Sequence, residues 1–169
     1  MVDYQKAFDM VDHQLLLSKL DIYGFNSKAI AWTKSYLSDR MQCVELSKTV
    51  KSSPSNIRHG IPQGSNFGPL FFVIFINDLP LYMRNTEVDL FADDTTISIP
   101  VDYSKSPQIL QDFVGEAISD VTGWASSNKM PVQPRKTNIT VVTGKRLKTK
   151  CDTRLHLPTS CTVNQVPNA

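Results

Sequence analysis

Two short runs of alternating apolar residues, separated by a pair of acids, constrain the fold most strongly. They form the stretch EVDLFADDTTISIP at residues 87–100. Alternation with a period of two is typical of strands with one buried face, and a short polar break between two such runs predicts a hairpin. The break holds Asp93 and Asp94. An ionised carboxylate is too costly to bury alone, so both acids must face water, pair with cations or bind a metal.

Helical periodicity surrounds this hairpin on both sides. Asp12 is placed to cap a first helix and Gly24 to end it, and Pro69 falls where the first turn of a buried helix tolerates it. The pattern predicts helices at 12–25, 26–40, 67–77 and 106–129, and strands at 1–4, 41–46, 55–61, 88–91, 95–99 and 138–144. This alternation predicts an α+β fold, with helices on one face of an antiparallel sheet.

Length and composition favour a soluble intracellular protein of one domain. The chain has 169 residues, 41% of them hydrophobic and 20% charged, which is ordinary for a globular protein. Its longest apolar run, LFFVIFI at 70–76, is far shorter than the ~20 residues that a membrane span needs. The acidic N-terminus does not resemble a signal peptide. Three cysteines without CxxC spacing argue against a disulfide framework or a zinc finger.

Basic residues gather near the C-terminus, although the net charge is only +2. Residues 135–154 contain seven Lys or Arg and one acid, Asp152. This stretch is either a solvated tail or a surface that contacts phosphates. Regular patterning ends near Lys145, and residues 146–169 are expected to form a basic, poorly ordered tail.

Two further features accompany the acid pair. Asp3 ends a predicted strand, and the loop GIPQGSNFGP at 60–69 holds Gln63 and Ser65 among glycines. Glycines let backbone N–H groups approach phosphates or a nucleotide closely, but a loop of this kind also serves as an ordinary connector. The acid pair is likewise compatible with an exposed turn or, if Asp3 meets it, with a metal site.

Other suggestive residues have simpler explanations. Asp9, Asp12 and His13 are close together in the sequence, but a helix cap and first-turn acids explain them better than a metal cluster. Trp32 and Trp124 lie on apolar helix faces and are expected to pack in the core.

Three segments in order resemble the first three palm motifs of reverse transcriptases, specifically those of non-LTR retrotransposons (LINE or jockey-like elements). They are VDYQKAFDMVDHQLLLSKL at 2–20, GIPQGSNFGPLFFVIFINDLP at 60–80 and LFADDTTI at 90–97. The segment GWASSNKMPVQPRKTNITVVTGK at 123–145 resembles the fourth motif. Any one motif is only suggestive, but their shared order and spacing make the joint resemblance specific.

The resemblance implies roles for individual residues. Asp3 and Asp93 match the aspartates that bind two magnesium (or manganese) ions, and Asp94 matches a neighbour with a less direct contact. Phe8 matches an aromatic residue that excludes ribonucleotides, although packing in the core would equally explain it. The remaining matches concern substrates: Gln63 and Gly64 line the incoming nucleotide and template, and Lys136 assists the departure of pyrophosphate.

The resemblance also implies a fold and partners. Residues 1–145 are expected to form a partial polymerase palm, truncated at both ends and without fingers or thumb, so that the isolated chain should not polymerise processively. The partners would be an RNA template, a DNA primer and deoxynucleoside triphosphates. Two alternatives stay open: a non-catalytic nucleic-acid-binding remnant that uses residues 135–154, and a relic without function. The sequence does not indicate an oligomeric state.

Overall fold

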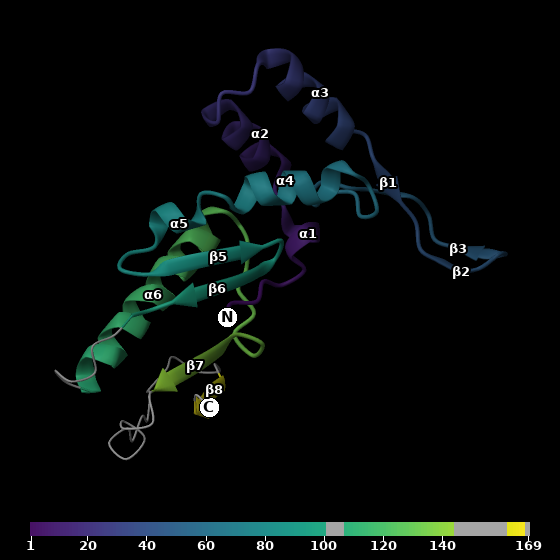
Figure 1. Ribbon diagram of the computed structural model, residues 1–169. Coiled ribbons are helices and arrows are strands. Elements are labelled where there is room, and N and C mark those ends of the chain that lie inside the picture. Colours follow the sequence, from purple (N-terminus) through teal and green to yellow (C-terminus); the bar gives the residue numbers. More distant parts are fainter. Residues whose placement is uncertain (101–106, 144–161, 168–169) are drawn as a thin grey trace. The chain divides into compact units, whose positions relative to one another are not determined.

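The structure, a computed structural model, describes residues 1–100, 107–143 and 162–167. The chain divides into two compact units. The hairpin unit joins Met1–Gln5 to Asp78–Ala169, and the helical unit is Lys6–Asn77. The described strands pair in twos and alternate with helices, so the predicted α+β class is confirmed (Figure 1). No helix in the described ranges has the length and apolar character that crossing a bilayer requires.

The hairpin unit is built around the strands that the alternating sequence predicts. β5 (Glu87–Phe91) and β6 (Asp94–Ser98) pair antiparallel and leave Ala92 and Asp93 as a two-residue turn. Ala92 has a φ of 52°. Two-residue hairpin turns that match the strand twist need a positive φ at their first position, which a non-glycine residue adopts only at some cost. The turn therefore fixes the path of the backbone through Asp93, where the chain passes from β5 to β6.

The N-terminus of the chain lies along β6. Val2 forms an antiparallel bridge with Thr95, and its N–H donates to the Thr95 carbonyl oxygen at 2.7 Å. Tyr4 forms a second antiparallel bridge with Val132. Met1–Gln5 therefore occupies a strand position between β6 and the segment around Val132, as the sequence predicts for the end of a strand.

A separate parallel pair completes the strands of this unit. β7 (Asn138–Thr143) pairs with β8 (Thr162–Pro167) along its whole length. The sequence predicts β7 but not β8, nor a parallel pair. The expected tail at 146–169 falls outside the described residues except for β8.

α6 (Pro107–Ser127) presents a long apolar face to the core of the hairpin unit. Its buried residues recur every three or four positions: Leu110, Val114, Ala117, Val121 and Trp124. The Trp124 Nε1–H donates to Asp78 Oδ1 at 2.8 Å, just before α5 (Leu79–Tyr82), and the ring centroids of Trp124 and Tyr4 lie 5.9 Å apart. Trp124 thus joins α6 to α5 and to the N-terminal strand, and its predicted packing role is confirmed.

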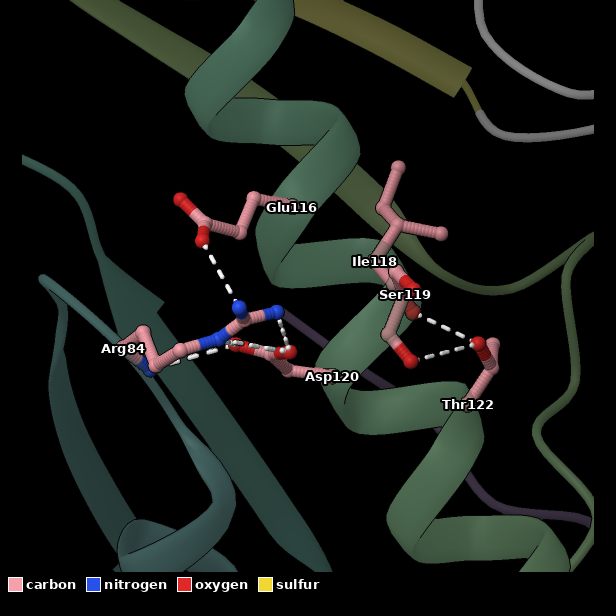
Figure 2. A network of polar contacts seen from close by, with 6 residues as sticks. All are labelled: Arg84, Glu116, Ile118, Ser119, Asp120 and Thr122. Carbon is pink, nitrogen blue, oxygen red and sulfur yellow. Dashed lines mark hydrogen bonds and ion pairs between the residues drawn. The ribbon is translucent and has the colours of Figure 1, made fainter.

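Arg84, between α5 and β5, contacts the middle of α6 through two carboxylates (Figure 2). Its Nε lies 3.2 Å from both carboxylate oxygens of Asp120, and its Nη1 lies 3.2 Å from Glu116 Oε1. The hydrogen bond from Arg84 lowers the pKa of Asp120, and the same bond raises the pKa of Arg84. Both groups therefore stay charged at neutral pH, and the contact persists there.

The helical unit contains the helices predicted at 12–25, 26–40 and 67–77 and one further short helix. It contains α1 (Ala7–Met10), α2 (His13–Ile22), α3 (Ser27–Leu37) and α4 (Phe67–Ile76). Asp12 caps α2 by accepting from the N–H groups of Gln14 and Leu15, and Gly24 follows α2 with a φ of 81°. Asn26 caps α3 by accepting from the Ala29 N–H. The short helix α1 is not predicted by the sequence.

A buried lysine joins α2 to α4. Lys19 Nζ donates to the Phe75 carbonyl oxygen at 2.6 Å and lies 4.5 Å from the centroid of the Phe75 ring. α4 buries Phe71, Phe72, Phe75 and Ile76, whereas Leu70 and Val73 stay about half exposed. The sequence correctly predicts an apolar helix here, part of whose surface remains exposed.

The rest of the helical unit is an exposed β segment between α3 and α4. β1 (Met41–Gln42) pairs antiparallel with β4 (Ser55–Asn56), and each lies within a strand that the sequence predicts. The intervening residues form a second small hairpin, β2 (Glu45–Ser47) with β3 (Val50–Lys51), where the sequence predicts strand and loop. Trp32 is packed only in part, because 48% of it is exposed although its ring stacks on that of Tyr36.

Candidate active site

The turn end of the β5–β6 hairpin carries two of the three candidate metal-binding aspartates, and the N-terminal strand carries the third. Asp93 lies in the turn and Asp94 begins β6. Because Val2 lies opposite Thr95 in an antiparallel bridge, the residues that follow on the N-terminal strand run toward Asp94. The structure therefore brings Asp3 alongside the hairpin pair.

Asp3 and Asp94 also share one face of this unit. Side chains alternate between the two faces of a strand. Val2, Tyr4 and Thr95 are buried, so Asp3 and Asp94 lie on the opposite face. Asp3 is half-buried, and Asp93 and Asp94 are exposed. The two hairpin carboxylates are therefore accessible to water.

Backbone hydrogen bonds hold Asp3 in this position. Its carbonyl oxygen accepts from the Gln133 N–H at 2.8 Å, and its own N–H donates to Thr137 Oγ1 at 3.4 Å. The Thr137 hydroxyl in turn donates to the Gln133 carbonyl oxygen at 3.0 Å. The turn that closes at Thr137 includes Lys136, whose N–H also donates to the Gln133 carbonyl oxygen. The segment of Lys136 is thus tied directly to the segment of Asp3, and the Lys136 side chain is exposed.

Two buried hydroxyls lie behind the aspartates. Tyr4 and Thr95 point to the core face, and among the described residues neither hydroxyl makes a hydrogen bond of acceptable geometry. Burial raises the pKa of Tyr4 to about 12, and the nearby Thr95 hydroxyl opposes this shift. Tyr4 therefore stays neutral and acts as packing beneath Asp3 rather than as a proton donor or acceptor.

In the helical unit, the glycine-containing loop folds back on the segment that holds Phe8. The Ile61 N–H donates to the Phe8 carbonyl oxygen at 2.9 Å, and the Gly60 N–H donates to the Val11 carbonyl oxygen at 2.8 Å. The His13 Nε2 lies 2.7 Å from the Gly60 carbonyl oxygen. This loop is therefore anchored at its start and is not a free connector.

Gln63 and Gly64 come next in this loop, and both are exposed. Gln63 Nε2 donates to Asp9 Oδ1 at 3.0 Å, and Gly64 has a φ of 76°. The Ser65 hydroxyl donates to the Pro62 carbonyl oxygen and accepts from the Gly68 N–H, which closes the loop onto the start of α4. The loop thus presents Gln63 in a fixed position.

Phe8 is half-buried and stacks on Phe72 of α4, with ring centroids 4.4 Å apart and an interplanar angle of 22°. This contact shows that Phe8 packs against the core of the helical unit. Its role in excluding ribonucleotides stays a prediction, since part of the ring remains accessible.

Comparison with known proteins decides the family. Residues 1–161 match the family described as reverse transcriptase (RNA-dependent DNA polymerase). The chain belongs to the reverse transcriptase family.

Individual relatives agree with this assignment. The RNA-directed DNA polymerase from mobile element jockey of Drosophila melanogaster is 33% identical over 144 residues, or 80% of this chain. The probable RNA-directed DNA polymerase from transposon BS of the same species is 31% identical over the same share. These matches confirm the resemblance to reverse transcriptases of non-LTR retrotransposons. The chain spans 15% of the length of each of these relatives.

The donor set of the reverse transcriptase aspartates suits a particular kind of metal site. Among residues 1–100, 107–143 and 162–167, no three His, Cys, Asp or Glu side chains are grouped so as to hold a metal ion by themselves. Carboxylates on neighbouring strands are nevertheless hard oxygen ligands, and magnesium keeps several waters and uses substrate phosphates. Asp3, Asp93 and Asp94 therefore offer oxygen donors of the kind that such a cation takes.

The reverse transcriptase motifs are distributed over both units. Asp3, Asp93, Asp94 and Lys136 all belong to the hairpin unit, where the bridge between Val2 and Thr95 puts Asp3 opposite Asp94. Phe8, Gln63 and Gly64 all belong to the helical unit, where the loop contacts bring their segments together. Sequence reasoning missed the supporting Thr137 and Tyr4, although Thr137 stands beside Lys136 in the fourth motif.

Two glycine variants test whether the start of the glycine-containing loop packs closely against the segment that follows Phe8. A Cβ at Gly60 would meet backbone atoms of Asp9 at 2.9 Å, and Gly60 has a φ of 87°. A Cβ at Gly64 meets nothing within 4 Å at a φ of 76°. Gly64→Ala should lower the free energy of unfolding by about 1 kcal/mol through backbone strain, and Gly60→Ala by about 2–5 kcal/mol through strain plus overpacking. Urea unfolding measures both, and equal losses would contradict the close packing.

Proposed function

We propose that residues 1–145 form the palm of an RNA-directed DNA polymerase that extends a DNA primer on an RNA template. The observation that supports this proposal most directly is the bridge between Val2 and Thr95, because Asp3 then lies opposite Asp94 on the neighbouring strand. Family membership supports the reaction class, and the outward-facing carboxylates supply the ligands that this chemistry requires.

The proposed reaction is a displacement at phosphorus. The primer 3′-hydroxyl gives up its proton to water, its oxygen attacks the α-phosphorus of a deoxynucleoside triphosphate, the bond to the bridging oxygen breaks, and pyrophosphate leaves. Two divalent ions, magnesium or manganese, would stabilise the attacking and the leaving oxygens. Asp3 and Asp93 would hold these ions, with Asp94 in support, and their half-buried to exposed position lets the triphosphate enter from solvent.

The other motif residues would act on the substrate. Lys136, exposed on a turn that is hydrogen-bonded to the Asp3 segment, would balance the charge of the departing pyrophosphate. Gln63 and Gly64 would line the incoming nucleotide. Phe8, fixed by its stacking on Phe72, would limit the room next to the sugar.

A chimeric polymerase tests this function directly. The matching segment of the jockey polymerase is replaced by residues 1–145 of this chain, so that regions outside the segment come from the jockey protein. We expect the chimera to extend a DNA primer on an RNA template when Mg²⁺ or Mn²⁺ is present and to stop when EDTA is added. A folded chimera, verified by circular dichroism, that binds the primed template but does not extend it would refute the proposal.

A further inference from the structure

Asp9 is not among the proposed metal-binding or substrate-binding residues, yet it contacts one of these residues, Gln63. Its Oδ1 accepts a hydrogen bond from Gln63 Nε2 at 3.0 Å, across 54 positions of sequence. Both side chains are exposed, so neither residue is needed to fill the core. The contact therefore calls for an explanation other than packing.

The chemistry of the two side chains fixes the orientation of the amide. An ionised carboxylate can only accept hydrogen bonds, whereas a glutamine amide has one end that donates and one that accepts. Asp9 therefore holds the –NH₂ end of Gln63, and the carbonyl oxygen Oε1 is turned away from Asp9. Without such a partner, the two ends of an amide are interchangeable by a half-turn about its last side-chain bond.

The backbone around the contact holds both partners in place. The loop start at Gly60 lies so close to Asp9 that a Cβ would meet its Cα and carbonyl oxygen at 2.9 Å. The neighbouring Ile61 N–H donates to the Phe8 carbonyl oxygen at 2.9 Å. The segment around Asp9 and the start of the loop are thus in direct contact next to Asp9. The loop backbone therefore holds Gln63 close to Asp9.

We propose that Asp9 is a positioning residue that keeps the Gln63 carbonyl oxygen free to accept a hydrogen bond from the incoming nucleotide. This rests on the proposed function, in which Gln63 lines the nucleotide. The nucleotide offers such a donor either as a sugar hydroxyl or as an N–H of its base. Asp9 should then strengthen nucleotide binding through Gln63. Its negative charge alone would weaken binding, because it repels a triphosphate.

The test follows the side-chain amide signals of Gln63 in the ¹⁵N-labelled, full-length chain, assigned by their loss in Gln63→Ala. The chain is titrated with dTTP and with 2′,3′-dideoxy-TTP. Asp9→Asn has nearly the same shape but lets the Gln63 amide turn over. It should shift the amide signals before nucleotide is added and weaken dTTP binding about 3- to 10-fold, the range expected for one neutral hydrogen bond. Asp21→Asn, another exposed aspartate of the helical unit, should change neither quantity.

The dideoxy arm identifies the donor. If the sugar hydroxyl donates, the dideoxynucleotide binds more weakly than dTTP and is not weakened further by Asp9→Asn. If the base donates, both nucleotides bind alike and are weakened alike. Unchanged or tighter dTTP binding in Asp9→Asn overturns the proposal, because it shows that only the charge of Asp9 matters. The measurement needs no primer extension, so its failure is distinguishable from failure of the chimeric polymerase.

Discussion

Replacing Asp93 with asparagine in the chimeric polymerase is expected to lower the rate of primer extension about a thousandfold or more. Asparagine keeps the size of the side chain but removes the charge that, in the proposed function, holds a divalent cation. Metal ions contribute several kcal/mol to phosphoryl transfer, and each 1.36 kcal/mol is about a tenfold change in rate. Because Asp93 is exposed in a turn, the substitution should leave the hairpin folded. Single-nucleotide extension on a primed RNA template measures the rate.

Asp89→Asn provides the matched control for this prediction. Asp89 is an exposed aspartate of the same hairpin, opposite Thr96 and away from the turn. If the position of Asp93 matters, Asp89→Asn should keep the extension rate within about twofold of the unsubstituted chimera, as surface changes usually do. Equal losses in the two variants would indicate a general effect of charge, and full activity of Asp93→Asn would rule out its role in metal binding.

The parts of the fold that the sequence predicted correctly are those determined by neighbours in the chain. The β5–β6 hairpin follows from alternation over a few residues and a two-residue break. The capping role of Asp12 follows from a side chain that reaches N–H groups two or three positions ahead. Such local contacts need no knowledge of the rest of the fold, and so they can be read from a short window of sequence.

The parts that were missed depend on distant partners. Lys19 looks like an exposed lysine of an amphipathic helix, and only the approach of α4 gives it the Phe75 carbonyl oxygen as an acceptor. β8 becomes a strand through its parallel pairing with β7, although its own residues carry little apolar signal. The contact between Asp9 and Gln63 likewise exists only after the loop folds back.

The candidate site shows the same division. Motif resemblance supplied the identities of Asp3, Asp93 and Asp94, and strand alternation supplied the face on which two of them lie. The proximity of Asp3 to the hairpin depends on the register between Val2 and Thr95, which no local pattern specifies. Roles that depend on a bound substrate, such as that of Phe8, stay predictions until the nucleotide is present.

Trp124→Ala should have the largest effect on stability, because Trp124 is fully buried and lies where three parts of the hairpin unit meet. The substitution removes the ring contact with Tyr4 and the hydrogen bond to Asp78. Truncating a buried tryptophan costs about 3–5 kcal/mol, which is a large share of the 5–15 kcal/mol that stabilises a typical domain. Since the hairpin unit holds all three candidate metal-binding aspartates, metal-dependent extension should be lost together with the fold.

Trp32→Ala is the matched control, with the same side chain removed from a position that is 48% exposed. Trp32 contacts the rings of Tyr36 and Phe67, and such aromatic pairs contribute about 0.5–1.5 kcal/mol beyond the buried area. In urea unfolding, Trp32→Ala should therefore lower the free energy of unfolding clearly less than Trp124→Ala does. Trp124→Phe should fall between the two, since it keeps an aromatic ring on the face of α6 but removes the N–H that Asp78 accepts. If Trp124→Ala unfolds at the same urea concentration as Trp32→Ala, the core of the hairpin unit does not depend on Trp124. The expected loss of metal-dependent extension together with the fold is then wrong.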